Sequence, residues 1–132
     1  MVVVVILVIV GSSSALVYQY ITEILPLKQI ETTIEYNKKF CPDEGFPLYI
    51  QIKNNSNKTI QNTHFYINVR AKGRSRNLRE EWGIAALYMD DKIIEPTKTY
   101  ANCFRVPHVR NVYKKMLPEL IYSIKIDKFR FE

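Results

Sequence analysis

Two different hydrophobic patterns divide the chain into a short N-terminal segment and a longer remainder. Residues 1–22 contain no charged side chain, and residues 2–10 are apolar without interruption. As a helix rising ~1.5 Å per residue, this segment spans about 33 Å, close to the thickness of a bilayer's hydrocarbon core. Tyr18 and Tyr20 stand where an aromatic belt at the membrane surface is expected. The pattern predicts a transmembrane signal-anchor helix over residues 1–28.

The same segment shares one feature with cleaved secretory signals. Ser13 and Ala15 suit a cleavage site after Ala15, but no Lys or Arg precedes them and the apolar character continues to Leu25. We therefore favour an anchor that stays on the protein. Its small residues would form a face that another transmembrane helix can approach closely. They are Gly11, Ser12, Ser14 and Ala15.

After Pro26, which is expected to end or kink the helix, the pattern changes to the two-residue period of β-strands. Residues 30–36 and 48–53 alternate between apolar and polar side chains. The turn-forming residues 54–58 follow, and residues 65–71 alternate again. We expect the two strands on either side of this turn to pair as an antiparallel hairpin.

Less regular apolar segments continue the strand pattern to the end of the chain. They cover residues 82–88, 93–94, 99–106 and 120–131, with a loop or one helical turn at 107–118. In the last segment the apolar positions change parity near Asp127, which predicts a β-bulge there. The seven short strands predict an all-β domain over residues 29–132. We expect an antiparallel β-sandwich of the immunoglobulin or fibronectin-III kind after one N-terminal transmembrane helix.

Cys41 and Cys103 are the only cysteines in the chain. A bond between them would close a loop of about 60 residues, which the loop-entropy model values at roughly 4 kcal/mol of stability. A zinc site is disfavoured, because there is no CxxC pair and no paired histidine. Two unrelated buried thiols are the alternative. We predict the disulfide, on condition that the domain is exported to an oxidising compartment.

Charge and cysteines favour opposite sides of the membrane. Lys28, Lys38 and Lys39 follow the span, and the positive-inside rule alone would place the domain in the cytoplasm. Folded domains translocate largely regardless of charge, however, whereas a disulfide needs an oxidising compartment. We expect a single-pass protein of the cell inner membrane with its C-terminal domain in the periplasm.

Basic residues exceed acidic ones, with a formal net charge of +6, and they gather in two runs. A basic loop on a tethered domain suits anionic lipid headgroups or an acidic partner subunit, and it can also be a plain solvated loop. Nucleic acid is disfavoured as a partner of an exported domain. The denser run consists of Arg70, Lys72, Arg74, Arg76 and Arg79, and the second of Arg105, Arg110, Lys114 and Lys115.

No residue pattern identifies a reaction. His64 and His108 are the only histidines, one on the polar side of a predicted strand and one in a loop, where surface or structural roles are expected. The acidic pairs at 43–44, 80–81 and 90–91 are typical of solvated turns, because a calcium loop needs more oxygen ligands at fixed spacing. We predict no enzyme activity, no cofactor, no metal site and no small-molecule substrate.

One stretch resembles known domains. The segment from Phe46 to Ser56, followed by Lys58-Thr59-Ile60, resembles the opening of small immunoglobulin-like or fibronectin-III-like domains and is similar to the FxLYD and LEA14-like group. The layout also resembles small bacterial single-pass proteins with an exported domain of this kind. The residues that carry this second likeness are Cys41, Asp91, Ile93, Ile94, Pro96, Cys103, Val106 and Pro107. Thr97 and Phe104 depart from the pattern, where Gly and Trp are expected. The resemblance implies the fold and leaves the function open.

These observations favour a membrane-tethered, non-enzymatic binding or structural module, an accessory subunit of a membrane protein complex. The expected contacts are membrane lipid, through the N-terminal helix, and a protein complex. The alternative is a cytoplasm-facing anchored domain whose basic loops contact anionic lipid or nucleic acid.

Overall fold

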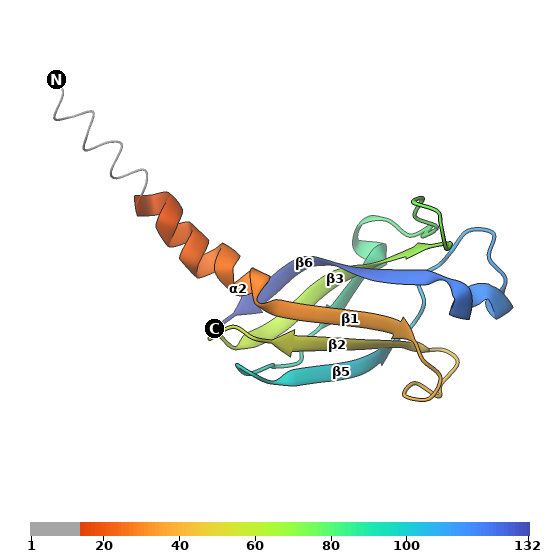
Figure 1. Ribbon diagram of the computed structural model, residues 1–132, viewed down its shortest axis with the longest axis horizontal. Helices are drawn as coiled ribbons and strands as arrows, with labels where there is room; N and C mark the ends of the chain where they lie inside the picture. Colours follow the sequence, from red (N-terminus) through yellow and green to blue (C-terminus); the bar gives the residue numbers. More distant parts are fainter. Residues whose placement is uncertain (1–13) are drawn as a thin grey trace, which may run out of the picture.

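The computed structural model describes residues 14–132, which form a helical segment followed by six β-strands. The strands make two three-stranded antiparallel sheets that pack face to face as a β-sandwich (Figure 1). The strand orders are β1-β2-β5 and β4-β3-β6. The strands are β1 (Ile30–Tyr36), β2 (Leu48–Asn54), β3 (Ile60–Arg70), β4 (Leu87–Asp90), β5 (Thr99–Phe104) and β6 (Ile121–Phe131).

The strand directions give the sandwich two unlike ends. β1 and β3 run away from the helical segment, and β2 and β6 run back toward it (Figure 1). The end next to the helical segment, which we call the proximal end, carries the connections 55–59 and 91–98 and the C-terminus. The other end, which we call the distal end, carries the longer connections 37–47, 71–86 and 105–120.

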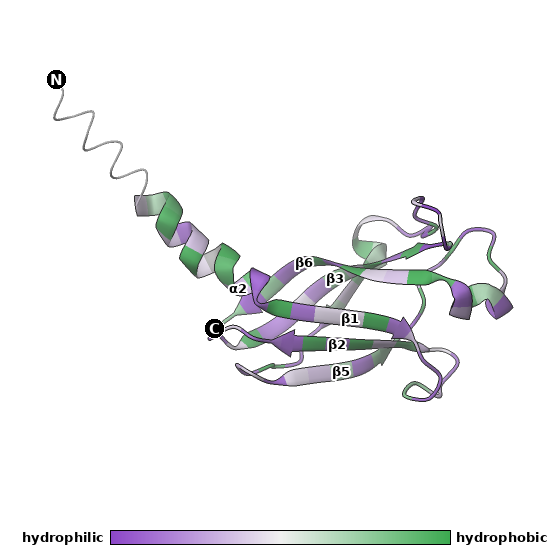
Figure 2. Cartoon of the chain, viewed as in Figure 1, coloured by the Kyte–Doolittle hydropathy of each residue, from purple (hydrophilic) through white to green (hydrophobic). Residues whose placement is uncertain are grey.

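The core lies between the sheets and comes from one side of each strand. In the two central strands, β2 and β3, alternate residues are buried, and Leu48, Ile50, Phe65 and Ile67 are at most 1% exposed. The alternation is visible as changing hydropathy along β1 and β2 in Figure 2. Successive side chains of a strand point to opposite faces, which is why the two-residue period predicted these strands.

The predicted hairpin across residues 54–58 is wrong, because this turn carries the chain from one sheet to the other. Asn54 at its start is fully buried. Its amide donates hydrogen bonds to the carbonyls of Lys58 at 2.8 Å and Ile94 at 2.9 Å, and its oxygen accepts from the Ser56 hydroxyl at 2.7 Å. These bonds hold the turn against the 91–98 connection, and the chain therefore does not form a hairpin here.

Two of the seven predicted strands also need correction, since residues 14–132 contain six. Ile94 forms only an isolated bridge with Ile60, and Ile93 beside it is exposed. The 82–88 segment begins with the 3-10 helix η2 (Gly83–Ala86), because Gly83 adopts a φ of 60° that starts a turn instead of a strand. The helical turn considered for residues 107–118 is the 3-10 helix η3 (Lys114–Glu119).

The bulge predicted near Asp127 is confirmed. His64 of β3 faces Lys128 of β6, whereas the next residue, Phe65, faces Ile126, so Asp127 is the extra residue. The insertion shifts the side-chain parity by one position. Tyr122 and Phe129 are therefore both buried, although they stand at positions of opposite parity.

The helical segment rests on the proximal end of the sandwich. It comprises residues 14–19, the π-helix η1 (Tyr20–Ile24) and α2 (Leu25–Lys28). Pro26 does not end the helix, which continues to Lys28 after the wider π turn. Pro26 is buried, and the Lys58 ammonium donates to the Thr22 carbonyl at 3.2 Å. The junction between helix and sandwich is thus a packed contact.

Within residues 14–132, no helix has both the length and the apolar character needed to cross a membrane. The first thirteen residues of the predicted span lie outside the described residues, and with them Gly11 and Ser12 of the predicted helix-packing face. The other two members of that face, Ser14 and Ala15, are helical and exposed.

Candidate functional site

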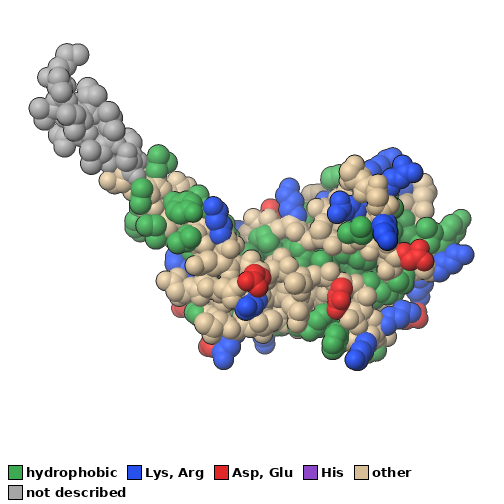
Figure 3. Space-filling model, in the orientation of Figure 1, with side chains coloured by type: hydrophobic (Ala, Val, Ile, Leu, Met, Phe, Trp, Pro, Cys, Tyr) green, Lys and Arg blue, Asp and Glu red, His purple; other side chains and the backbone are tan. Residues whose placement is uncertain are grey.

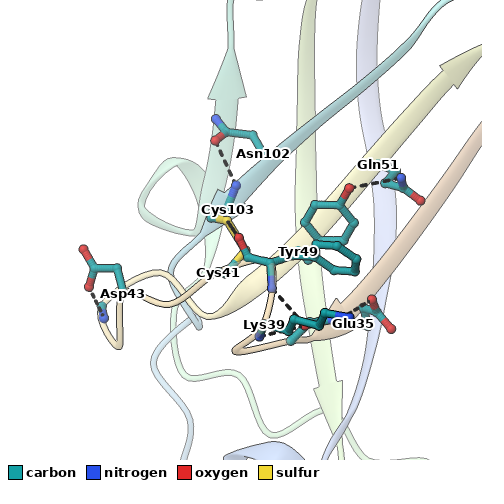
Figure 4. The surroundings of a disulfide bond; sticks show 11 residues. Glu35, Lys39, Cys41, Asp43, Tyr49, Gln51, Asn102 and Cys103 are labelled. Carbon is teal, nitrogen blue, oxygen red and sulfur yellow. Dashed lines mark hydrogen bonds between the residues drawn. A yellow bond between two sulfur atoms is a disulfide. The ribbon is translucent and has the colours of Figure 1, made fainter.

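A disulfide holds the distal end together. Cys41 and Cys103 are bonded, with their Cα atoms 5.7 Å apart, which confirms the predicted pair (Figure 4). Cys41 is buried in the β1–β2 connection and Cys103 belongs to β5. Beside the bond, the rings of Phe40 and Tyr49 stack with centroids 4.9 Å apart. The long 37–47 connection is therefore fixed to the strand next to β2.

The basic loop after β3 folds back onto its own strand. Asn77 holds it there. The Asn77 side-chain oxygen accepts hydrogen bonds from the backbone N–H groups of Val69 at 3.1 Å and Arg79 at 3.2 Å, and its amide donates to the Asn68 oxygen at 2.9 Å. The backbone N–H of Leu78 donates to the Val69 carbonyl at 2.7 Å. A loop tied at these points presents its charges from fixed positions.

The two basic runs, far apart in the sequence, lie side by side in the structure. Arg79 of the first run forms an antiparallel bridge with Val109, inside the second run. A backbone hydrogen bond of 2.8 Å from Glu80 to His108 lies next to this bridge. The 71–86 and 105–120 connections therefore make one continuous surface at the distal end.

Arg79 is clamped between aromatic rings. Its guanidinium carbon lies 5.2 Å from the ring centroid of Tyr66 and 5.4 Å from that of Trp82. One terminal nitrogen donates to the Ile67 carbonyl at 3.4 Å, while the buried Nε has no hydrogen-bond partner within residues 14–132. Trp82 itself is 68% exposed and precedes the left-handed Gly83. The turn and the stacked guanidinium together hold the indole ring at the surface.

A hollow of about 590 Å³ opens beside this ring. Its lining combines arginines with apolar side chains, and no carboxylate is among the described residues that line it. Its volume falls within the ~300–1,000 Å³ typical of ligand pockets. A second hollow of about 440 Å³ shares Met116 and Leu120 with it. The lining includes Arg76, Arg79, Arg110, Trp82, Met116 and Leu120.

The net charge of the protein is concentrated at this end. Residues 70–81 and 105–119 hold nine Lys or Arg and three Asp or Glu, a difference of six that equals the +6 of the whole chain. The rest of the sequence is therefore balanced in charge. On the face shown in Figure 3, basic side chains crowd the end of the sandwich away from the helix.

Ion pairs neutralise part of this charge. Arg105 meets Glu81 at 3.2 Å, Arg110 meets Glu80 at 3.2 Å, and Lys114 meets Glu44 at 2.7 Å. The hydrogen bond from Lys114 lowers the pKa of the Glu44 carboxyl, and the same bond raises the pKa of the Lys114 ammonium. None of the five residues of the denser run makes an ion pair with a described residue.

Tyr88 of β4 contacts Arg105, a residue of the second basic run. Burial raises the pKa of Tyr88 to about 12, and its hydroxyl donates to the Arg105 carbonyl at 3.1 Å. The Arg105 guanidinium lies 5.2 Å from the same ring. Tyr88 is thus a structural contact between the two sheets and stays protonated.

The histidines do not join this surface as a pair. His64 is half-buried in β3, and His108 is exposed in the 105–120 connection. Within residues 14–132 no three His, Cys, Asp or Glu side chains gather as metal ligands would. The expectations of no enzyme activity, no cofactor and no small-molecule substrate stay predictions.

Sequence reasoning identified the basic residues of this surface but missed the residues that shape it. The hydrophobic pattern gives no role to Asn77, and it predicts Trp82 as the start of a strand. A signal was present, since Trp82 is the only tryptophan and stands between charged residues and Gly83. The contribution of Met116 depends on where η3 packs, which no local pattern reveals.

Comparisons with known proteins identify a family and nothing more specific. Neither a curated protein nor a solved structure matches the chain. The resemblance to the FxLYD and LEA14-like group and to single-pass membrane proteins has no support from these comparisons. One family model covers residues 1–129, nearly the whole sequence. The chain therefore belongs to the family described as a protein of unknown function, DUF2393.

Proposed function

We propose that this protein is a membrane-tethered, non-enzymatic binding module, an accessory subunit whose distal end meets an acidic partner protein. One observation carries the proposal. The whole net positive charge of the chain lies on the last residue of β3, Arg70, and on the two connections that meet at the end opposite the helical segment. An electropositive surface of this kind attracts and orients an acidic partner.

The tether is supported by the sequence. The 22 uncharged residues at the N-terminus have the length and composition of a signal-anchor. The small residues Gly11, Ser12, Ser14 and Ala15 suit close packing against a helix of the partner complex. The Cys41–Cys103 disulfide supports an exported, periplasmic domain, because cytosolic thiols are kept reduced.

The strand arrangement supports an immunoglobulin-like or fibronectin-III-like sandwich. In that fold, strands A, B and E neighbour one another in one sheet, and C and F are neighbours in the other. The orders β1-β2-β5 and β4-β3-β6 correspond to A-B-E and C′-C-F. Such sandwiches serve many unrelated functions, so the functional argument rests on the distal surface alone.

The distal position argues against the headgroups of the protein's own membrane. β3 has 11 residues, so its two ends are about 35 Å apart at ~3.3 Å per residue. Electrostatic attraction is screened beyond roughly 8 Å at physiological ionic strength. A tether at the proximal end therefore leaves the basic loops outside the field of that membrane and open to a protein.

Single-stranded nucleic acid is the second candidate, because exposed aromatic rings accompany the basic residues. Trp82 is 68% and Tyr113 is 73% exposed, and bases stack on such rings. The disulfide weighs against this candidate, since it favours a compartment without nucleic acid.

Charge reversal tests the proposal. The Arg74→Glu/Arg76→Glu double variant should lose retention on immobilised poly-glutamate, and retention of the wild type should fall as salt rises. The matched control is Lys98→Glu/Lys128→Glu, which changes the net charge equally at exposed proximal positions and should bind normally. Equal retention of both variants would refute a distal site for acidic partners.

Reporter fusions at the C-terminus test the tether and its orientation. A reporter active only outside the cytoplasm should give signal in the membrane fraction, and one active only inside should give none. The reverse pattern would refute the periplasmic placement.

A further inference from the structure

We propose that the hollow beside Trp82 seats an acidic segment of the partner that also carries apolar side chains. This inference rests on the proposed function and specifies the chemistry of the partner. Arg76 and Arg110 would receive carboxylates at the rim, and the apolar lining would receive the aliphatic groups between them.

The first support is the composition of the lining. Three arginines and several apolar side chains share one concave surface, which no described carboxylate interrupts. Arg76 makes no ion pair within residues 14–132. Arg110 donates from its Nε to the Glu80 carboxylate, and its guanidinium carries four further N–H donors. Guanidinium groups of this kind bind carboxylates through paired hydrogen bonds.

The second support is the exposure of apolar groups at the same place. Trp82 is 68% and Met116 is 40% exposed, and both line the hollow. A purely acidic partner would neutralise the arginines but would leave this surface in contact with water. An acidic segment with aliphatic side chains would neutralise the arginines and also cover the apolar lining, because burying apolar surface is favourable.

The third support is rigidity. The Arg79 guanidinium is stacked against Trp82 and Tyr66, Asn77 ties the loop to β3, and Gly83 sets the turn after the indole. A preformed site loses little conformational entropy on binding. Arg79 is therefore a positioning residue, while Arg76 and Arg110 contact the ligand.

Trp82 supplies the readout, because the chain has no other tryptophan. The purified full chain is titrated with two short peptides of equal charge, one of glutamates alone and one of glutamates with interspersed leucines. We expect the leucine peptide to bind about tenfold more tightly, the equivalent of one or two partly buried side chains, and to shift Trp82 emission to shorter wavelengths. Arg76→Glu should weaken both peptides.

The apolar half has its own matched variants. Met116→Ser should reduce the advantage of the leucine peptide at least severalfold and leave the binding of the glutamate peptide unchanged. Met89→Ser is the control, because Met89 is 62% exposed on β4 and does not line the hollow. An equal loss in the two variants would overturn the assignment of the hollow.

The outcomes separate this inference from the proposed function. Equal binding of both peptides without a change in Trp82 emission would overturn the hollow as the seat, while salt-sensitive glutamate binding would keep the acidic partner. Failure of both peptides to bind would overturn both proposals. Tighter binding of a single-stranded oligonucleotide or of phosphatidylglycerol vesicles than of the leucine peptide would overturn the acidic segment.

Discussion

The two ends of the sandwich connect their strands in opposite ways. The proximal end has short connections, one of which is organised by a single buried side chain, Asn54, and its charges balance. The distal end has long connections that are held by cross-links: the disulfide, the Asn77 hydrogen bonds and the Arg79–Val109 bridge. At the proximal end, hydrogen bonds of one buried side chain are enough to set a connection. At the distal end, several cross-links between long connections fix a charged, partly apolar surface.

Removing the disulfide should produce the largest effect of the comparison. The Cys41→Ser/Cys103→Ser variant should lose about 4 kcal/mol of unfolding free energy, because a 62-residue separation no longer restricts the unfolded chain. That is a large part of the ~5–15 kcal/mol of a typical domain. Denaturant unfolding measures it, and reductant should destabilise the wild type but not the variant. A loss below about 1 kcal/mol would mean that the distal end does not depend on this cross-link.

At the proximal end, Asn54→Ala should cost about 3 kcal/mol, because it removes a fully buried side chain together with its hydrogen bonds to two carbonyls and to the Ser56 donors. The control is Asn55→Ala, which removes an exposed amide that donates to the Glu31 carboxylate at 2.7 Å and should cost less than ~0.5 kcal/mol. Denaturant unfolding of both variants provides the test. Similar losses at the two positions would contradict the role given to Asn54.

Two arginines of the distal surface should differ by a smaller amount. Arg79→Ala should cost about 1–2 kcal/mol, since it removes two cation–π contacts and a hydrogen bond to Ile67. Arg76→Ala should stay within ~0.5 kcal/mol. Trp82 emission should change in the first variant alone. If both variants leave the emission unaltered, Arg79 does not position the indole.

The Glu44–Lys114 pair should have the smallest effect, because both side chains are exposed. The pKa of Glu44 is lowered from its ordinary 4.5, so the pair stabilises the folded state above pH 4.5 and loses this contribution as the pH falls through the lower, folded-state pKa. Glu44→Gln should therefore lower the thermal midpoint slightly at pH 7 and leave it unchanged in strong acid. A larger difference in acid than at neutral pH would contradict the sign.

The sequence was most informative where one local rule acts alone. Residues 30–36 form the strand β1 that their alternation predicts, and the parity change near Asp127 marks the bulge. Both predictions succeed because side chains of a strand alternate between faces, whatever the rest of the fold does. The disulfide followed from the presence of only two cysteines.

The sequence was misleading where a residue acts through distant partners. The turn at 54–58 looked like a hairpin, because its hydrogen bonds to the carbonyl of Ile94, forty residues away, leave no local trace. The predicted interaction residues, from Arg70 to Arg79, were visible as charges. No local pattern revealed that Arg76 and Arg79 line one hollow together with Arg110 and Met116.

The sequence by itself determined most of the strands, the bulge, the pairing of the cysteines and the excess of positive charge, because each depends on side-chain period or residue type. Only the tertiary structure decided which strands are neighbours, that the two basic runs meet at the end away from the helix, and that Trp82 faces a hollow. These features arise from contacts between residues that are distant in the sequence, and the energies that select them come from packing and hydrogen bonds that form only when the sheets close on each other.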